Sequence, residues 1–147
     1  MTELIRILIA DDHLSVRQGL AALLVARNGM TVIGEAATGQ EAIELARTLR
    51  PDVTLIEMIL PDMTGPTVIS RIKADNPEAR ILVLTHFDDS QSVSAALQAG
   101  ASGYLLIDSG PDVLFQAIRK VQGGHMFFPE LGSTADRSPA QSCGRDS

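Results

Sequence analysis

The stretch LIRILIADD, residues 4–12, decides the fold prediction, because a short apolar run ends directly at two acidic residues. Leu4–Ala10 is apolar almost throughout, which is typical of a parallel strand that is buried on both faces. A helix is predicted next, over Leu14–Arg27. Its apolar residues recur at helical spacing and are Val16, Leu20, Leu23 and Leu24.

The same alternation of apolar run and helical segment continues along the chain. Four further strands are predicted, at Thr31–Ala36, Asp52–Glu57, Arg80–Thr85 and Gly103–Leu106. Four further helices are predicted, at Thr38–Leu49, from about Val68 to Asn76, at Ser90–Ala99 and at Pro111–Gln122. Five such units predict an α/β fold: a doubly wound five-stranded parallel sheet in the order 2-1-3-4-5, with right-handed crossovers. In that order ligands bind at the carboxyl ends of strands 1 and 3.

Composition narrows the classes of protein. The 147 residues suit one domain, and an aromatic content of 3% predicts an aliphatic core. A net charge of −6 argues against binding a nucleic acid backbone. Cys143 is the only cysteine, so no intrachain disulfide forms. With neither a signal peptide nor an apolar run long enough to cross a bilayer, we expect a cytoplasmic protein with no membrane contact.

The C-terminal residues differ in character from the rest. From about Glu130 the sequence LGSTADRSPAQSCGRDS is rich in Ser, Gly, Pro, Asp and Arg and has no apolar periodicity. This predicts one domain over residues 1–129 and a disordered tail over residues 130–147. The tail has neither a helical pattern nor a basic stripe, so we expect no DNA-binding domain and no nucleic acid binding by this chain alone.

Three carboxylates are predicted to meet at one edge of the sheet. Asp11 and Asp12 follow the first strand, and Glu57 ends the third, its neighbour in the predicted order. Repulsion between them requires a bound divalent cation, a raised carboxyl pKa or a compensating Lys or Arg. Oxygen ligands of this kind favour Mg²⁺, with Mn²⁺ as second choice. Asp12 alone has a simpler interpretation, as N-cap of the helix beginning near Leu14.

Several consecutive motifs resemble those of a known family. They are ILIADDH, PDVTLIEMILPDMTG, ILVLTHFDD, AGASGYLLIDS and GGHMFFPE. In order and spacing they resemble the receiver domains of two-component response regulators, especially the NarL/FixJ subfamily, from Ile5 to Pro129. The resemblance implies a flavodoxin-like receiver fold and a signalling domain rather than an enzyme. It also implies that a sensor histidine kinase or a phosphotransfer protein donates a phosphoryl group to the domain.

The resemblance assigns roles to residues by position. Asp11 and Asp12 correspond to the pair that holds Mg²⁺, together with the backbone carbonyl of Ile59. Glu57 stands at the phosphoacceptor position and also among the predicted metal ligands. Thr85 corresponds to the switch hydroxyl, although it also suits a plain strand.

Tyr104 corresponds to the switch aromatic of the family, or it is simply part of the core.

Two positions depart from the family pattern. Glu57 replaces the phosphoacceptor aspartate, which moves the carboxylate oxygen by about an ångström or more. Ile107 replaces a lysine and offers no cation to phosphoryl oxygens.

These departures predict a receiver module with altered or phosphorylation-independent switching. Two alternatives stay open: a pseudo-receiver that acts purely as a protein-interaction scaffold, and the receiver part of a truncated NarL/FixJ-type transcription factor. The resemblance also implies that the surface Ser90–Gln122 contacts partners, and this surface would permit a homodimer. A flavodoxin-like cofactor enzyme is disfavoured, because Asp11, Asp12 and His13 occupy the loop where a phosphate-binding sequence would be needed.

Overall fold

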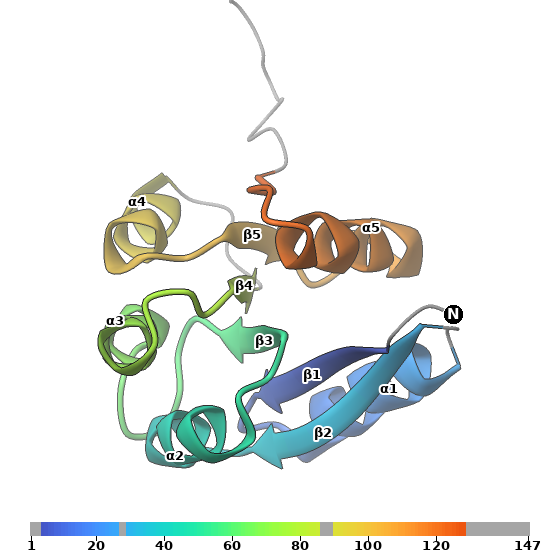
Figure 1. The fold of residues 1–147 in the computed structure, drawn as a ribbon, viewed down its shortest axis with the longest axis horizontal. Coiled ribbons are helices and arrows are strands. Elements are labelled where there is room, and N and C mark those ends of the chain that lie inside the picture. The colour runs from blue at the N-terminus through green and yellow to red at the C-terminus, as the bar shows by residue number, and fades with distance from the viewer. Residues whose placement is uncertain (1–3, 27–28, 86–89, 129–147) are drawn as a thin grey trace, which may run out of the picture.

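The computed structural model describes residues 4–26, 29–85 and 90–128, and its centre is a five-stranded parallel sheet (Figure 1). The strand order is β2-β1-β3-β4-β5, which confirms the predicted topology. The strands are β1 (Ile5–Ala10), β2 (Met30–Ala36), β3 (Val53–Glu57), β4 (Ile81–Thr85) and β5 (Gly103–Leu106). The predicted disordered tail, residues 130–147 with Cys143, lies outside the described residues.

In the described ranges, four helices connect the strands and a fifth follows β5. They are α1 (Leu14–Val25), α2 (Gly39–Leu49), α3 (Gly65–Asp75), α4 (Ser90–Ala99) and α5 (Pro111–Gln122). The prediction that the third helix begins near Val68 was wrong, because the Thr64 hydroxyl accepts a hydrogen bond from the backbone N–H of Thr67 and caps a helix that starts at Gly65. Among the described residues, no helix is both long enough and apolar enough to span a bilayer.

The helices cover both faces of the sheet (Figure 1), with α1 and α5 on one side and α2, α3 and α4 on the other. Each side has its own aliphatic core. The central strands β3 and β4 are buried along their whole length, as is typical of strands in a parallel sheet covered on both faces. In α1, Leu20 and Leu24 are buried, whereas Leu23 is 38% exposed.

The segment after α5 returns to the edge of the sheet. Phe127 forms a parallel bridge with Gly103, and its carbonyl accepts a hydrogen bond of 3.0 Å from the N–H of Tyr104. The N–H of Phe127 donates to the carbonyl of Ser102 at 3.1 Å. These bonds satisfy backbone groups that β5 would otherwise expose as an edge strand.

Gly103 is the position at which this contact is tightest. A Cβ atom there would lie 2.7 Å from the Phe127 carbonyl oxygen and 2.8 Å from Leu82 Cδ1. We therefore expect Gly103→Ala to lower the free energy of unfolding by about 1–3 kcal/mol, as overpacking does. Urea denaturation monitored by circular dichroism measures this.

Gly19 provides the matched control. It lies within α1, where a Cβ atom would meet nothing within 4 Å. Gly19→Ala should raise the free energy of unfolding by about 0.5–1 kcal/mol, because alanine is the better helix former. Equal effects of the two substitutions would contradict the described packing of Phe127 on β5.

Candidate functional site

The carboxyl ends of four neighbouring strands bring the predicted site residues together. Ala10 pairs with Ile56 across β1 and β3, and the next residues along these strands are Asp11 and Glu57. The register therefore confirms the predicted approach of the two chain segments at the switch point between β1 and β3.

The register continues through β4 and β5 to the other predicted positions. Glu57 pairs with Leu84 of β4, and Thr85 is the next residue after Leu84 and the last of that strand. Thr85 pairs with Leu106, and the N–H of Ile107 donates to the Thr85 carbonyl at 2.8 Å. The predicted phosphoacceptor, hydroxyl and lysine positions thus lie together at the carboxyl ends of β3, β4 and β5.

Burial distinguishes the acidic residues of this edge. Asp11 and Glu57 are 3% and 5% exposed, and Thr85 is fully buried. The Asp12 side chain is 32% exposed and lies nearer to solvent. Two carboxylates largely removed from water carry a desolvation cost and interact through a lower dielectric than surface charges, which favours a compensating cation.

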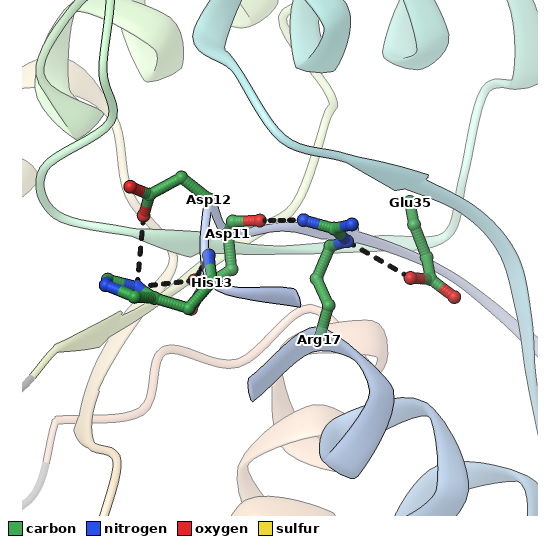
Figure 2. A network of polar contacts seen from close by, with 5 residues as sticks. All are labelled: Asp11, Asp12, His13, Arg17 and Glu35. Atoms are coloured by element: carbon green, nitrogen blue, oxygen red, sulfur yellow. Dashed lines mark hydrogen bonds and ion pairs between the residues drawn. The ribbon is translucent and has the colours of Figure 1, made fainter. Parts of the chain in front are cut away.

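His13 lies against the two aspartates (Figure 2). Its Nδ1 atom is 3.3 Å from Asp11 Oδ1 and 3.1 Å from Asp12 Oδ1. One potential ligand atom from each of these three residues lies within 4.8 Å of the others, and Glu57 is not part of this group. The N-cap of α1 is His13, so the simpler interpretation of Asp12 as the N-cap was wrong.

Arg17 fixes the backbone of this turn. Its Nη1 donates to the Asp11 carbonyl oxygen at 2.7 Å, and its Nε is 3.2 Å from Glu35 Oε1 (Figure 2). The guanidinium group is thus occupied by a carbonyl and by a carboxylate of β2. Arg17 is therefore not the compensating cation that was one of the outcomes expected for the side chains of Asp11 and Asp12. In the described residues, the side-chain partner of those carboxylates is the His13 imidazole.

The loop between β3 and α3 is folded tightly beneath the site. Ile59 and Thr64 form an isolated antiparallel bridge, and the N–H of Gly65 donates to the Met58 carbonyl at 2.6 Å. A Cβ atom on Gly65 would lie 2.9 Å from the carbonyl oxygen of Glu57. Close approach at Gly65 thus sets the backbone position of Glu57. The role of the Ile59 carbonyl as a metal ligand stays a prediction.

Asp62 anchors this loop to α2. Its carboxylate accepts hydrogen bonds from the N–H groups of Gly39, at 2.7 Å, and Gln40, at 3.0 Å. Both groups belong to the first turn of α2, where N–H groups lack partners within the helix. These bonds stabilise the charged form, and they lower the pKa of Asp62 below its usual value.

We expect Asp62 to make stability pH-dependent in acid. Its folded-state pKa lies below the unfolded value, so its contribution is complete above about pH 4 and is lost as the pH falls through the lowered pKa. Asp62→Asn should be less stable than the unmodified chain at pH 7, and the gap should close in acid. Urea midpoints measured from pH 7 to pH 2 test this, and a gap independent of pH would contradict it.

Tyr104 and Ile107 have apolar surroundings. Tyr104 is 1% exposed and belongs to the core that α2, α3 and α4 cover. Ile107 lines a cavity of about 160 Å³ whose walls include Leu20 of α1, Leu84 of β4 and Leu114 of α5. Ile107, the predicted lysine position, therefore lines a leucine-rich cavity, which agrees with the apolar interpretation of this strand end.

Sequence reasoning assigned no site role to His13, Arg17, Glu35 and Asp62. The histidine directly after two aspartates was a usable signal for a cation near the site. Asp62 could have been found because the predicted helix near Thr38 needs acceptors for its first N–H groups. The contact of Arg17 with Glu35 joins residues 18 positions apart and had no local signal.

Comparison with known proteins supports the resemblance to response regulator receiver domains. A model of the response regulator receiver domain matches residues 7–119. The nitrate/nitrite response regulator protein NarP of Escherichia coli is 40% identical over 125 residues, which are 85% of this chain and 58% of NarP. The transcriptional regulatory protein LnrK of Bacillus subtilis is 41% identical over 126 residues, which are 86% of this chain and 57% of LnrK.

A solved structure gives the same result. The signal receiver domain of the putative response regulator NarL from Mycobacterium tuberculosis superposes with a TM-score of 0.80 at 32% identity, covering 84% of this chain and 99% of that domain. The chain spans about three fifths of the length of the curated relatives it matches. The matching family model, the identity with these relatives and the shared topology show that the chain belongs to the response regulator receiver domain family of two-component signalling, with NarL-like relatives.

Proposed function

We propose that this receiver module switches without forming an acyl phosphate, because Glu57 places a permanent carboxylate where the family carries a phosphorylated aspartate. The observation that carries the proposal is the position of Glu57, 5% exposed, at the end of β3 between Asp11 and Thr85. A charge held there acts on the hydroxyl end of β4 continuously. Its effect is a standing bias toward the conformation that partners bind.

Phosphoryl transfer to Glu57 is disfavoured by geometry. Catalysis of this reaction depends mainly on positioning the attacking oxygen in line with the phosphorus, next to the metal. The extra methylene of glutamate moves that oxygen by about an ångström, and a displacement of that size costs about a hundredfold in rate.

Ile107 removes a second requirement. A lysine there would supply an ammonium group to the phosphoryl oxygens, whereas isoleucine supplies only aliphatic carbon toward the leucine-rich cavity. A phosphoryl group on Glu57 would therefore lack one of its two anchors. Thr85 is the anchor that remains.

We propose a divalent cation as cofactor, Mg²⁺ first and Mn²⁺ second. The donor set fits, because Asp11 and Asp12 provide carboxylate oxygens at the end of β1 and Asp12 is partly open to solvent. Such an ion neutralises the negative charge that gathers at this edge. Asp11 and Asp12 would hold it, and the Ile59 carbonyl and Glu57 are the further ligands that the family pattern suggests.

Partners and output follow from the family. Receiver domains of response regulators interact with histidine kinases and often dimerise. We propose that this chain makes a homodimer through the surface of α4, β5 and α5, Ser90–Gln122, and that it signals by protein contact rather than as an enzyme. The relative LnrK is a transcriptional regulatory protein. If this domain belongs to such a regulator, dimerisation is the step that would pass its signal on.

The substitution Glu57→Gln tests the proposal, because it removes the charge and keeps the length of the side chain. We expect the amide signals of Thr85 and Tyr104 in ¹H–¹⁵N NMR spectra to shift, and self-association in sedimentation to weaken. The matched control is Glu44→Gln, an exposed residue of α2. Unchanged signals at Thr85 and Tyr104, with unchanged self-association, would refute a standing bias from Glu57.

A further inference from the structure

We infer that His13 is a third protein ligand of the cation held by Asp11 and Asp12, and that its imidazole raises the affinity of the site for transition-metal ions such as Ni²⁺ or Zn²⁺ while leaving that for Mg²⁺ nearly unchanged. The inference rests on the proposed metal site and assigns it a selectivity. It comes from the ligand group that the structure forms, in which the third member is an imidazole and not the carboxylate of Glu57.

The distances suit simultaneous coordination. With metal–ligand bonds of about 2.1 Å, neighbouring ligands of a tetrahedral or octahedral ion lie about 3.0–3.4 Å apart. His13 Nδ1 lies 3.1 Å from Asp12 Oδ1 and 3.3 Å from Asp11 Oδ1. All three ligand atoms lie within 4.8 Å of one another, so one ion could contact them without a large rearrangement of the turn.

The turn that presents these atoms is held by three backbone interactions. The N–H of His13 donates to Asp11 Oδ1 at 2.8 Å, and the N–H of Arg17 donates to the His13 carbonyl at 3.0 Å. The Arg17 guanidinium holds the Asp11 carbonyl at 2.7 Å. Preorganisation of this kind reduces the ordering cost of binding an ion.

Exposure allows an ion to enter and water to complete its coordination. The side chain of His13 is 64% exposed and that of Asp12 is 32% exposed, whereas the side chain of Asp11 is buried. A site with two carboxylates, one imidazole and an open side has room for water ligands, like other three-ligand metal sites.

Ligand chemistry sets the preference. Mg²⁺ favours oxygen ligands and retains several waters, so an added nitrogen contributes little to its binding. Ni²⁺ and Zn²⁺ bind imidazole well, and they bind mixed nitrogen and oxygen sites more tightly than the earlier divalent ions. Nδ1 coordination requires the tautomer with its proton on Nε2.

The competing explanation is that His13 Nδ1 is only a polar partner of the two carboxylates, with a proton on Nδ1 that points toward Asp11 and Asp12. Both explanations place the ring in the same position, but they predict opposite roles in metal binding. A ligand adds affinity for ions that accept nitrogen. A hydrogen-bond donor competes with the ion for the carboxylate oxygens, so its removal would leave affinity unchanged or raise it.

The test is isothermal titration calorimetry of untagged protein with NiCl₂ and separately with MgCl₂. The background carries His86→Ala, His125→Ala and Cys143→Ser, which remove every other histidine and the thiol. We expect His13→Ala in this background to weaken Ni²⁺ binding about tenfold or more and to change Mg²⁺ binding less than about twofold. Zn²⁺ should shift the His13 ring signals in NMR spectra of the background protein.

The controls separate this inference from the proposed metal site. Asp12→Asn should weaken both ions, and if it weakens neither, the proposed site itself is wrong. If Asp12→Asn weakens both ions but His13→Ala leaves Ni²⁺ affinity unchanged or higher, the metal site stands and the role of His13 as a ligand is refuted. Circular dichroism of each variant confirms that the fold is retained.

Discussion

The double substitution Glu57→Asp with Ile107→Lys should accept a phosphoryl group from acetyl phosphate at least about a hundredfold faster than the unmodified chain, in the presence of Mg²⁺. Aspartate is one methylene shorter than glutamate, so it moves the attacking oxygen back toward the end of β3, to the distance that the family uses. The lysine supplies the cation that phosphoryl oxygens lack beside Ile107. Initial rates of acyl phosphate formation, followed by intact-protein mass spectrometry, measure the gain.

The single substitutions apportion this gain. Glu57→Asp alone should restore most of the rate if oxygen position is the main barrier, whereas Ile107→Lys alone should restore little. A lysine at position 107 has to extend past the leucine-rich cavity to bring its ammonium group to the carboxyl end of β3. Its flexible apolar stem allows this. If the double variant is as slow as the unmodified chain, the two substitutions are not what blocks phosphorylation.

The largest loss of stability among the site residues is expected for Tyr104→Ala. Tyr104 is 1% exposed and packs in the core that also contains Ile81, Val83 and Ala96. Removing a buried aromatic ring leaves a cavity and should lower the free energy of unfolding by about 3–5 kcal/mol. Urea denaturation at neutral pH measures the loss.

Tyr104→Phe is the matched control, since it retains the ring and removes only the hydroxyl. We expect it to change the free energy of unfolding by less than about 1.5 kcal/mol. A small loss for Tyr104→Ala would mean that the ring leaves the core readily, as a freely moving switch would. A large loss would show that any rotamer change of Tyr104 has to be coupled to repacking of α4.

The topology could be predicted from sequence because local pattern and general rules were sufficient. Continuous apolarity identified the buried strands, and alternation with helices left the order 2-1-3-4-5 as the economical solution. The boundary of α3 was missed because Pro61 and Gly65 suggest a loop. Thr64 followed by Pro66 is the signal that was overlooked, since a capping residue and a proline in the first turn mark a helix start.

The candidate site was predictable only as far as backbone register determines it. Asp11 and Glu57 follow paired residues of β1 and β3, so their approach was a consequence of topology. The group that the structure forms contains His13 instead of Glu57, because the turn before α1 directs the imidazole toward both aspartates. Such side-chain directions depend on local turns and on contacts between distant residues, which apolar periodicity does not report.

On this proposal, Glu57 acts as a fixed charge and does not carry a phosphoryl group. The most direct measurement is the intact mass of the unmodified chain after incubation with acetyl phosphate and Mg²⁺, with Glu57→Gln as the reference. We predict that neither protein gains the mass of a phosphoryl group. Rapid, metal-dependent addition of a phosphoryl group that maps to Glu57 and is lost in Glu57→Gln would contradict the claim.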